Sequence, residues 1–178
     1  EQKNPSTFYM EYPDRLRMET KMGMMNVTII SDSSGVTAVV PGQGSMKLPS
    51  AQSQPIRETV YRDPVYYLTN LDKYEVQYVG GENVQNREVE TLLLSHSGHS
   101  FHLFLDPDTY IPVGMKYSTV SPQGPVEVTE IFSEYKTFNQ ISIPMKTVSY
   151  TEGEKISEST VDSIEFNMTI DPSLFQIQ

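Results

Sequence analysis

Apolar and polar residues alternate with a period of two along most of the chain. The clearest run is 15–22, where Leu16, Met18, Thr20 and Met22 alternate with charged residues. Such alternation predicts a strand with one covered face and one face in water. Similar runs predict further strands at 7–12, 24–31, 36–40, 74–79, 126–138, 141–150 and 155–167, with a turn at Gly80-Gly81. With the segment described next, this makes about ten strands.

Residues 88–120 are expected to form three strands at the centre of a sheet. Ser97-Gly98 has the composition of a two-residue hairpin loop, and residues 106–109 (Asp-Pro-Asp-Thr) have that of a type I turn. The loop fixes a register that pairs His96 with His99, Leu94 with Phe101 and Leu92 with Leu103. Both faces of this hairpin then carry apolar side chains, as in a central strand pair that is covered on both sides.

The pattern changes over residues 45–73, where three prolines disfavour a continuous strand. Ser50 is a candidate cap for a short helix. Asp63-Pro64 resembles an N-cap followed by proline at the first helical position. We therefore expect an insertion with one or two short helices that lies across a sheet face.

Loops of hairpin length join nearly all the predicted strands, so neighbours in sequence should be neighbours in space. A twisted sheet of about ten strands curls and acquires a concave face. The predicted fold is mainly β: one domain, 1–178, built on a large curved antiparallel sheet (a half-open β-barrel). Its insertion at 45–73 covers the concave face.

Composition and charge exclude several classes of function. The chain has no cysteine, so it has no disulfide, cysteine nucleophile or thiolate metal site. The net charge of −10 arises in residues 50–178, and it disfavours nucleic acid and anionic membranes as partners. Apolar runs are too short to span a membrane. The chain opens without Met and enters a strand at once, so we expect it to be a piece of a longer precursor.

Candidate catalytic and metal-binding groups give little support for an enzyme. His96, His99 and His102 surround one hairpin, but a zinc site wants a further convergent ligand and a second shell, which the sequence does not supply. Acidic pairs such as Asp106 and Asp108 lie in predicted turns. Phosphate-loop and serine-elbow motifs are absent from the sequence. We predict no enzyme, metal or cofactor; hydrolysis through the three histidines is a remaining hypothesis.

The methionines give a stronger signal. Six of the nine lie in the first 46 residues, and Met18 and Met22 share the covered face of one strand, where Met10 can join them. Methionine fills irregular space and adapts to varied apolar ligands. Ordinary core packing and a pliable lining for an acyl-like ligand are both open interpretations.

The second half of the chain contains an ordered set of landmarks. Residues 105–113 (LDPDTYIPV) resemble a "D-x-x-T-x-x-P" hairpin. Residues 132–136 (FSEYK) followed by 141–144 (ISIP) resemble an "F-x-x-Y … I-x-I-P" pair, and 164–167 with 170–175 resemble a characteristic ending. In this order residues 101–178 resemble the C-terminal half of the outer-membrane lipoprotein carrier superfamily (LolA-like proteins).

The resemblance implies an incomplete β-barrel closed by helices around an apolar cavity that shelters acyl chains. It also implies export to the periplasm or cell envelope. The chain departs from the family in showing no helix before its first strand. In the family, an arginine lies near the helical lid that closes the barrel, and Arg15 or Arg17 would correspond to it. Alternation places both on the wet face of their strand, so we do not transfer that role.

The predicted function is non-enzymatic binding of lipid or lipoprotein acyl chains in the bacterial cell envelope, as a carrier or sorting factor. The alternative is an envelope sensor or interaction module with a filled concave face and a protein partner. The predicted ligand-binding residues are Phe8, Met10, Leu16, Met18, Met22, Leu92, Leu94, Phe101, Leu103, Met115 and Met145, with Tyr66, Tyr67 and Leu68 as cover.

Overall fold

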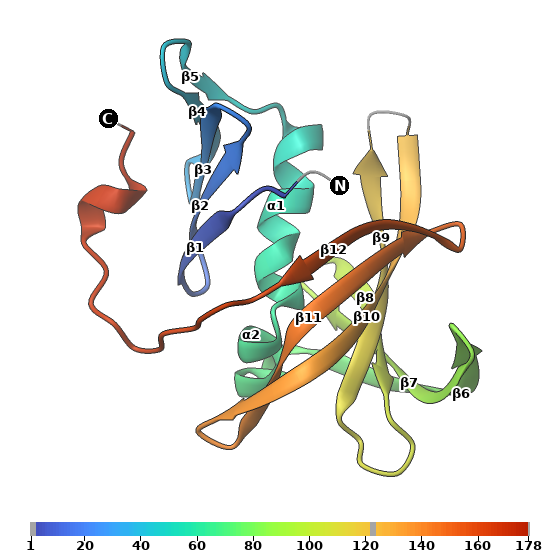
Figure 1. Ribbon diagram of the computed structural model, residues 1–178. Helices are drawn as coiled ribbons and strands as arrows, with labels where there is room; N and C mark the ends of the chain where they lie inside the picture. Colours follow the sequence, from blue (N-terminus) through green and yellow to red (C-terminus); the bar gives the residue numbers. More distant parts are fainter. Residues whose placement is uncertain (1–2, 122–123, 178) are drawn as a thin grey trace. The chain divides into compact units, whose positions relative to one another are not determined.

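The computed structural model describes residues 3–121 and 124–177 (Figure 1). Its strands form two antiparallel sheets, and each sheet follows the order of the sequence. By compactness the chain divides into two units. The first unit comprises the chain up to Tyr66 together with the segment from Glu165 onwards, and the second comprises Tyr67–Ile164.

The five-stranded sheet of the first unit has the order β1-β2-β3-β4-β5. Its strands are β1 (Ser6–Glu11), β2 (Arg15–Met22), β3 (Met25–Asp32), β4 (Gly35–Val40) and β5 (Gly44–Lys47). Strand β2 has the bounds that the alternation predicts. Short turns join all five strands, which explains why sequence neighbours pair throughout.

The predicted insertion contains α1 (Ser50–Arg62), α2 (Pro64–Thr69) and a 3₁₀ turn, η1 (Leu71–Lys73). It begins later than the sequence pattern indicates. Residues 45–47 instead form most of the edge strand β5, because the turn before them returns the chain to β4, where Gly44 pairs with Val40.

The two predicted helix caps have different outcomes. Asp63 caps α2 as predicted: its Oδ1 accepts hydrogen bonds from the backbone N–H of Val65 at 2.9 Å and of Tyr66 at 3.4 Å. Ser50 is not a cap. It is the first residue of α1, Pro49 occupies the N-cap position, and no side chain caps that end.

The seven-stranded sheet of the second unit has the order β12-β11-β10-β9-β8-β7-β6. Its strands are β6 (Glu75–Val84), β7 (Arg87–His96), β8 (His99–Leu105), β9 (Pro112–Ser121), β10 (Gly124–Phe138), β11 (Ile141–Thr151) and β12 (Glu154–Thr160). The predicted register of the 88–105 hairpin is confirmed, with His96 opposite His99 and Leu94 opposite Phe101. The predicted fold class, mainly β with a short helical insertion, is also confirmed, although two sheets share the strands.

The predicted turn at Gly80-Gly81 is wrong. Strand β6 continues through both glycines, and the pairing with β7 shifts register between Tyr78 and Gly80. Glycine inside a strand often marks such a bulge. The turn lies at Gln85-Asn86, where φ is 51° and 62°.

In the first unit, α1 lies along one side of the sheet and the C-terminal 3₁₀ turn η2 (Pro172–Phe175) along the other (Figure 1). The two arginines of β2 contact this C-terminal turn. Arg17 Nη1 donates to the Leu174 carbonyl oxygen at 2.6 Å, and the Arg15 guanidinium lies 5.8 Å from the centre of the Phe175 ring. The expectation that both arginines lie on a wet face is therefore wrong for Arg17, whose side chain is only 18% exposed.

The second unit buries side chains on both faces of its central strands, as the sequence predicts. Leu94, Phe101 and Leu103 are buried on one face, and Thr91 and Phe104 on the other. Apolar groups on both faces are typical of strands in the interior of a sheet.

Candidate ligand-binding surface

The five predicted ligand-binding residues at the N-terminus share one face of the five-stranded sheet. Phe8 pairs with Met18 and Met10 pairs with Leu16 across β1 and β2. Directly paired residues project to the same face, and residues two apart on one strand do so as well. Met22 lies on this face too, four residues beyond Met18.

The same face carries further apolar residues that the sequence reasoning did not assign. Met25 pairs with Met22 and Ile29 pairs with Met18 across β2 and β3. Ala38 opposes both Ile29 and Met46, which extends the row to β5. We call this set the methionine face: Phe8, Met10, Met18, Met22, Met25, Ile29 and Met46. The two-residue loop Gly23-Met24 fixes the β2–β3 register, so this signal was present in the sequence.

Exposure varies across the methionine face and its neighbours. Leu16 is buried in the core at 3% exposure and Met10 and Met18 are half-buried. Phe8, Met22, Met25 and Met46 are exposed, at 52%, 45%, 53% and 62%. One part of this side of the sheet is therefore packed in the core, and the other part exposes apolar side chains to water.

The remaining predicted strand residues lie on one face of the seven-stranded sheet. Leu103 pairs with both Leu92 and Met115, and Leu94 pairs with Phe101. The register across β10 places Met145 on this face as well. Apart from the half-buried Leu92, these side chains are at most 4% exposed. They are packed residues rather than an open surface.

The three predicted cover residues of α2 have different surroundings. In the first unit the Tyr66 ring lies 5.4 Å from Tyr12 and 6.0 Å from Tyr61, centre to centre. In the second unit the buried Tyr67 ring lies 5.8 Å from Phe101. Leu68 is half-buried. Of these three, Tyr67 is the residue that packs against a predicted ligand-binding residue of a strand, Phe101.

The histidine hairpin has local structural contacts. His96 Nδ1 lies 2.8 Å from the Lys73 carbonyl oxygen, and its ring lies 5.0 Å from the Tyr74 ring. Over residues 3–121 and 124–177, no three His, Cys, Asp or Glu side chains lie close enough together to hold a metal ion.

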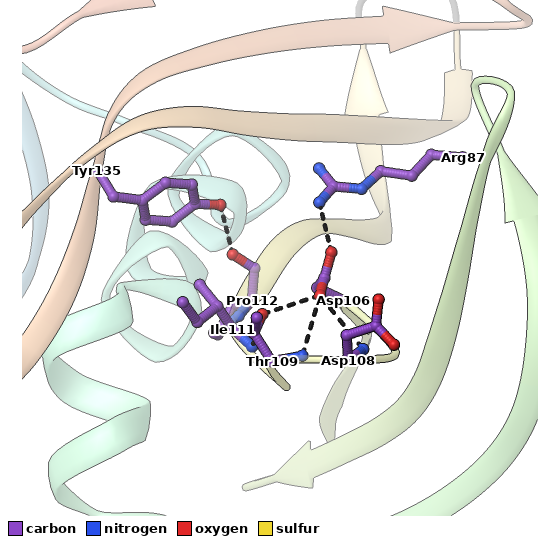
Figure 2. Close-up of polar contacts among 7 residues, drawn as sticks. All are labelled: Arg87, Asp106, Asp108, Thr109, Ile111, Pro112 and Tyr135. Carbon is purple, nitrogen blue, oxygen red and sulfur yellow. Dashed lines mark hydrogen bonds and ion pairs between the residues drawn. The ribbon is translucent and has the colours of Figure 1, made fainter.

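The turn that carries the first landmark of the resemblance is organised by Asp106 (Figure 2). Its Oδ1 accepts hydrogen bonds from the backbone N–H and hydroxyl of Thr109, at 3.0 and 2.9 Å, and Arg87 Nη2 donates to Oδ2 at 2.8 Å. The hydrogen bond from Arg87, followed by those from Thr109, lowers the pKa of Asp106 to about 2.

The residues that follow this turn are held by a second side chain. The Tyr135 hydroxyl donates to the carbonyl oxygen of Pro112 (Figure 2), and burial raises the pKa of Tyr135 to about 12. Asp, Thr and Pro of the landmark therefore hold the turn between β8 and β9 in place, and the Tyr110 N–H closes this turn by donating to the Asp106 carbonyl oxygen at 2.8 Å, one residue beyond the bond of a type I turn. They serve the fold of this region.

Asp63 is a half-buried acidic residue at the junction of α1 and α2. Tyr12 Oη donates to Asp63 Oδ1 at 2.7 Å, alongside the two backbone N–H groups of α2. Burial raises the pKa of the Asp63 carboxyl, while the hydrogen bonds from Tyr12 and the helix act in the opposite direction. This side chain ties the end of β1 to the junction of α1 and α2.

Comparison with family models and with curated protein sequences gives no match. No helix in the described part of the chain has the length and apolar character needed to cross a membrane.

Solved structures do match. A Vibrio parahaemolyticus domain named for outer membrane lipoprotein sorting has a TM-score of 0.58 at 14% identity, over 96% of this chain and 79% of its own. A DUF1329 family protein from Desulfovibrio piger has a TM-score of 0.51 at 12% identity, over 98% and 82%. A LolA superfamily protein from Nitrosomonas europaea has a TM-score of 0.45 at 11% identity, over 90% and 84%. The chain thus shares its fold with the first of these proteins, in agreement with the predicted resemblance to the outer-membrane lipoprotein carrier superfamily.

Proposed function

We propose that this protein binds the acyl chains of a lipid or lipoprotein, without catalysis, as a carrier or sorting factor of the bacterial cell envelope. The observation that carries the proposal is the methionine face, on which Phe8, Met22, Met25 and Met46 are each at least 45% exposed. Large apolar side chains gathered on one exposed face mark an interaction surface more often than they mark a core.

The chemistry of this face suits acyl chains. Methionine is unbranched and has three rotatable bonds, so neighbouring methionines can adjust to ligands of different length and shape. Removal of apolar area from water supplies roughly 25 cal/mol per Å², and it requires no directional contact. A face of this kind binds many acyl chains with modest selectivity.

The likeness of fold supports the proposed role and location. The Vibrio parahaemolyticus domain is named for outer membrane lipoprotein sorting, a process of the cell envelope. The likeness shows the fold, and the transfer of substrate and compartment to this chain is our proposal.

The packed residues of the seven-stranded sheet remain a separate proposed site within the second unit. Tyr67 and Tyr74 lie against Phe101, with ring centres 5.8 and 6.3 Å away. An acyl chain would reach Phe101 and its neighbours only when these tyrosines move aside. We therefore assign ligand binding at an exposed surface to the methionine face of the first unit.

Binding of a fluorescent fatty acid to delipidated protein tests the proposal. We expect Phe8→Ser with Met22→Ser to weaken binding by about tenfold or more, because tenfold corresponds to about 1.4 kcal/mol, less than the burial energy of two such side chains. Ile156→Ser on β12 is a matched control, since Ile156 is 58% exposed and lies on the other sheet. Equal binding by all three proteins, or none by any, would favour the alternative of a filled interaction module.

A further inference from the structure

The tip of the β2–β3 hairpin carries three methionines. Met22 and Met25 are the last paired residues of the two strands, and Met24 lies in the two-residue loop between them. Met22 and Met25 are about half exposed, and Met24 is fully exposed. Methionine is ordinarily among the more buried residues, so three exposed methionines at one tip need an explanation other than core packing.

The geometry of the tip favours convergence of these side chains. Paired residues of antiparallel strands have Cβ atoms about 5 Å apart, which lets two flexible thioethers approach a common point. Gly23 has φ of +63°, as the first position of a type II′ loop requires, and a Cβ atom placed there would meet nothing within 4 Å. The loop is therefore tight and open to solvent, and Met24 is free to turn toward its neighbours.

The chemistry of three thioethers selects a particular class of ligand. The thioether sulfur is uncharged, soft and a weak hydrogen-bond acceptor, so it offers little to Mg²⁺ or Ca²⁺. Soft thioether donors select Cu(I), and Ag(I) has the same charge and softness. Lys21 precedes Met22 on β2, so alternation directs its ammonium group to the opposite face.

We propose that Met22, Met24 and Met25 form a binding site for a soft monovalent metal ion, Cu(I) or Ag(I). This site goes beyond acyl binding, although it shares Met22 and Met25 with the methionine face. Each metal–sulfur contact replaces a sulfur that lies in water, so binding does not require the hairpin to unfold.

Titration of the protein with Ag(I) in chloride-free buffer, followed by NMR of ¹³C-methyl methionine, tests the proposal. Ag(I) needs no reductant and serves as the probe. We expect the methyl signals of Met22, Met24 and Met25 to shift together and to saturate at one equivalent of Ag(I). Signals of the buried Met115 and Met145 should stay in place. Shifts spread over other methionines, or binding no tighter than that of free methionine, would overturn the proposal.

Substitution by leucine separates the sulfur from the apolar bulk. The triple variant Met22→Leu, Met24→Leu, Met25→Leu conserves side-chain volume and removes the thioethers. It should lose about 100-fold or more in Ag(I) affinity, the advantage of several linked contacts over one. Met46→Leu is the matched control, because Met46 is 62% exposed on the same sheet and distant in register. It should keep full affinity.

The same variants distinguish failure of this site from failure of the proposed function. Met24 lies in the loop and outside the methionine face, so Met24→Leu should lower Ag(I) affinity and leave fatty acid binding unchanged if acyl binding is correct. Undiminished Ag(I) affinity in the triple variant, or an equal loss in Met46→Leu, contradicts the metal site whatever the fatty acid result. The single variant Met24→Leu, at a fully exposed position, provides a test that cannot depend on core packing.

Discussion

Asp63 joins three segments of the first unit through one carboxylate oxygen. It follows α1, caps α2 through the N–H groups of Val65 and Tyr66, and accepts the hydroxyl hydrogen of Tyr12. The sequence predicts the cap, because Asp followed by Pro is a local signal. The hydrogen bond from Tyr12 joins residues far apart in the sequence and has no such signal.

Substitution of Asp63 should separate its hydrogen bonds from its charge. We expect Asp63→Ala to lower the free energy of unfolding by about 1 kcal/mol, the usual value of an N-cap. Asp63→Asn keeps an acceptor oxygen without the buried charge. Because burial raises the pKa of Asp63 in the folded protein, the wild type loses stability as the pH rises through that pKa. Asp63→Asn should therefore be at least as stable as wild type at pH 7, by urea denaturation. A loss equal to that of Asp63→Ala would contradict this account.

Asp106 should show the opposite dependence on pH. Its pKa falls from an ordinary 3.8 to about 2, first through the hydrogen bond from Arg87 and then through Thr109. The ionised form is thus favoured in the folded protein, and its stabilisation is present above about pH 4 and lost as the pH falls toward 2. We expect Asp106→Asn to be less stable than wild type at pH 7, with a difference that shrinks over this interval. A difference that stays constant from pH 7 to pH 2 would show that the carboxylate charge has no part in it.

Strand β9 depends on a glycine at a point of close backbone approach. A Cβ atom on Gly114 would lie 2.4 Å from the carbonyl oxygen of Glu130 on β10 and 3.2 Å from Phe104 on β8. Both contacts come from neighbouring strands, so the sheet itself would have to shift to remove the clash with the added Cβ atom. The sequence pattern marks 112–120 as a strand but contains no sign of this contact.

Alanine at Gly114 should therefore be costly where alanine at another strand glycine is not. We expect Gly114→Ala to lower the free energy of unfolding by about 2 kcal/mol or more, as overpacking of a filled interior does. Gly81→Ala in β6 is the control, because its nearest contact would be an ordinary 3.7 Å to the Val89 carbonyl oxygen. Equal denaturation midpoints for the two variants would contradict the packing argument.

Strand prediction succeeds where the determinants are local. Ser97-Gly98 fixes the β7–β8 register because a two-residue loop leaves few alternatives, and all three predicted pairs are observed. Gly80-Gly81 misleads because the same residue type forms a bulge as readily as a turn. Arg17 misleads for another reason: the carbonyl oxygen that it binds belongs to Leu174, 157 residues away.

The division into two sheets lies beyond what periodicity can predict. Alternation and loop length show which strands are neighbours, but they do not show where a row of hairpins is interrupted. The interruption falls at the helical insertion, between β5 and β6. The C-terminal segment also rejoins the first unit, so that Phe175 is buried there. Such a return is a tertiary contact without a local sequence signal.

The candidate site was predictable to a similar extent. The sequence places Phe8, Met10, Met18 and Met22 together because alternation needs only two adjacent strands, and the register confirms that they share a face. The prediction omits Met25, although the two-residue loop Gly23-Met24 sets its register, and it omits Met46, which joins the face through β5. The sequence predicts that the residues of the seven-stranded sheet are covered, but it does not indicate whether protein side chains or a ligand cover them.

Covalent capture of a diazirine-labelled fatty acid, with the labelled peptides read by mass spectrometry, tests acyl binding at the methionine face most directly. Our account predicts that label concentrates on peptides from β1, β2 and the start of β3, at Phe8, Met22 and Met25, and that unlabelled fatty acid competes it away. Label that spreads without competition, or that concentrates on β12 around Ile156, would contradict the account.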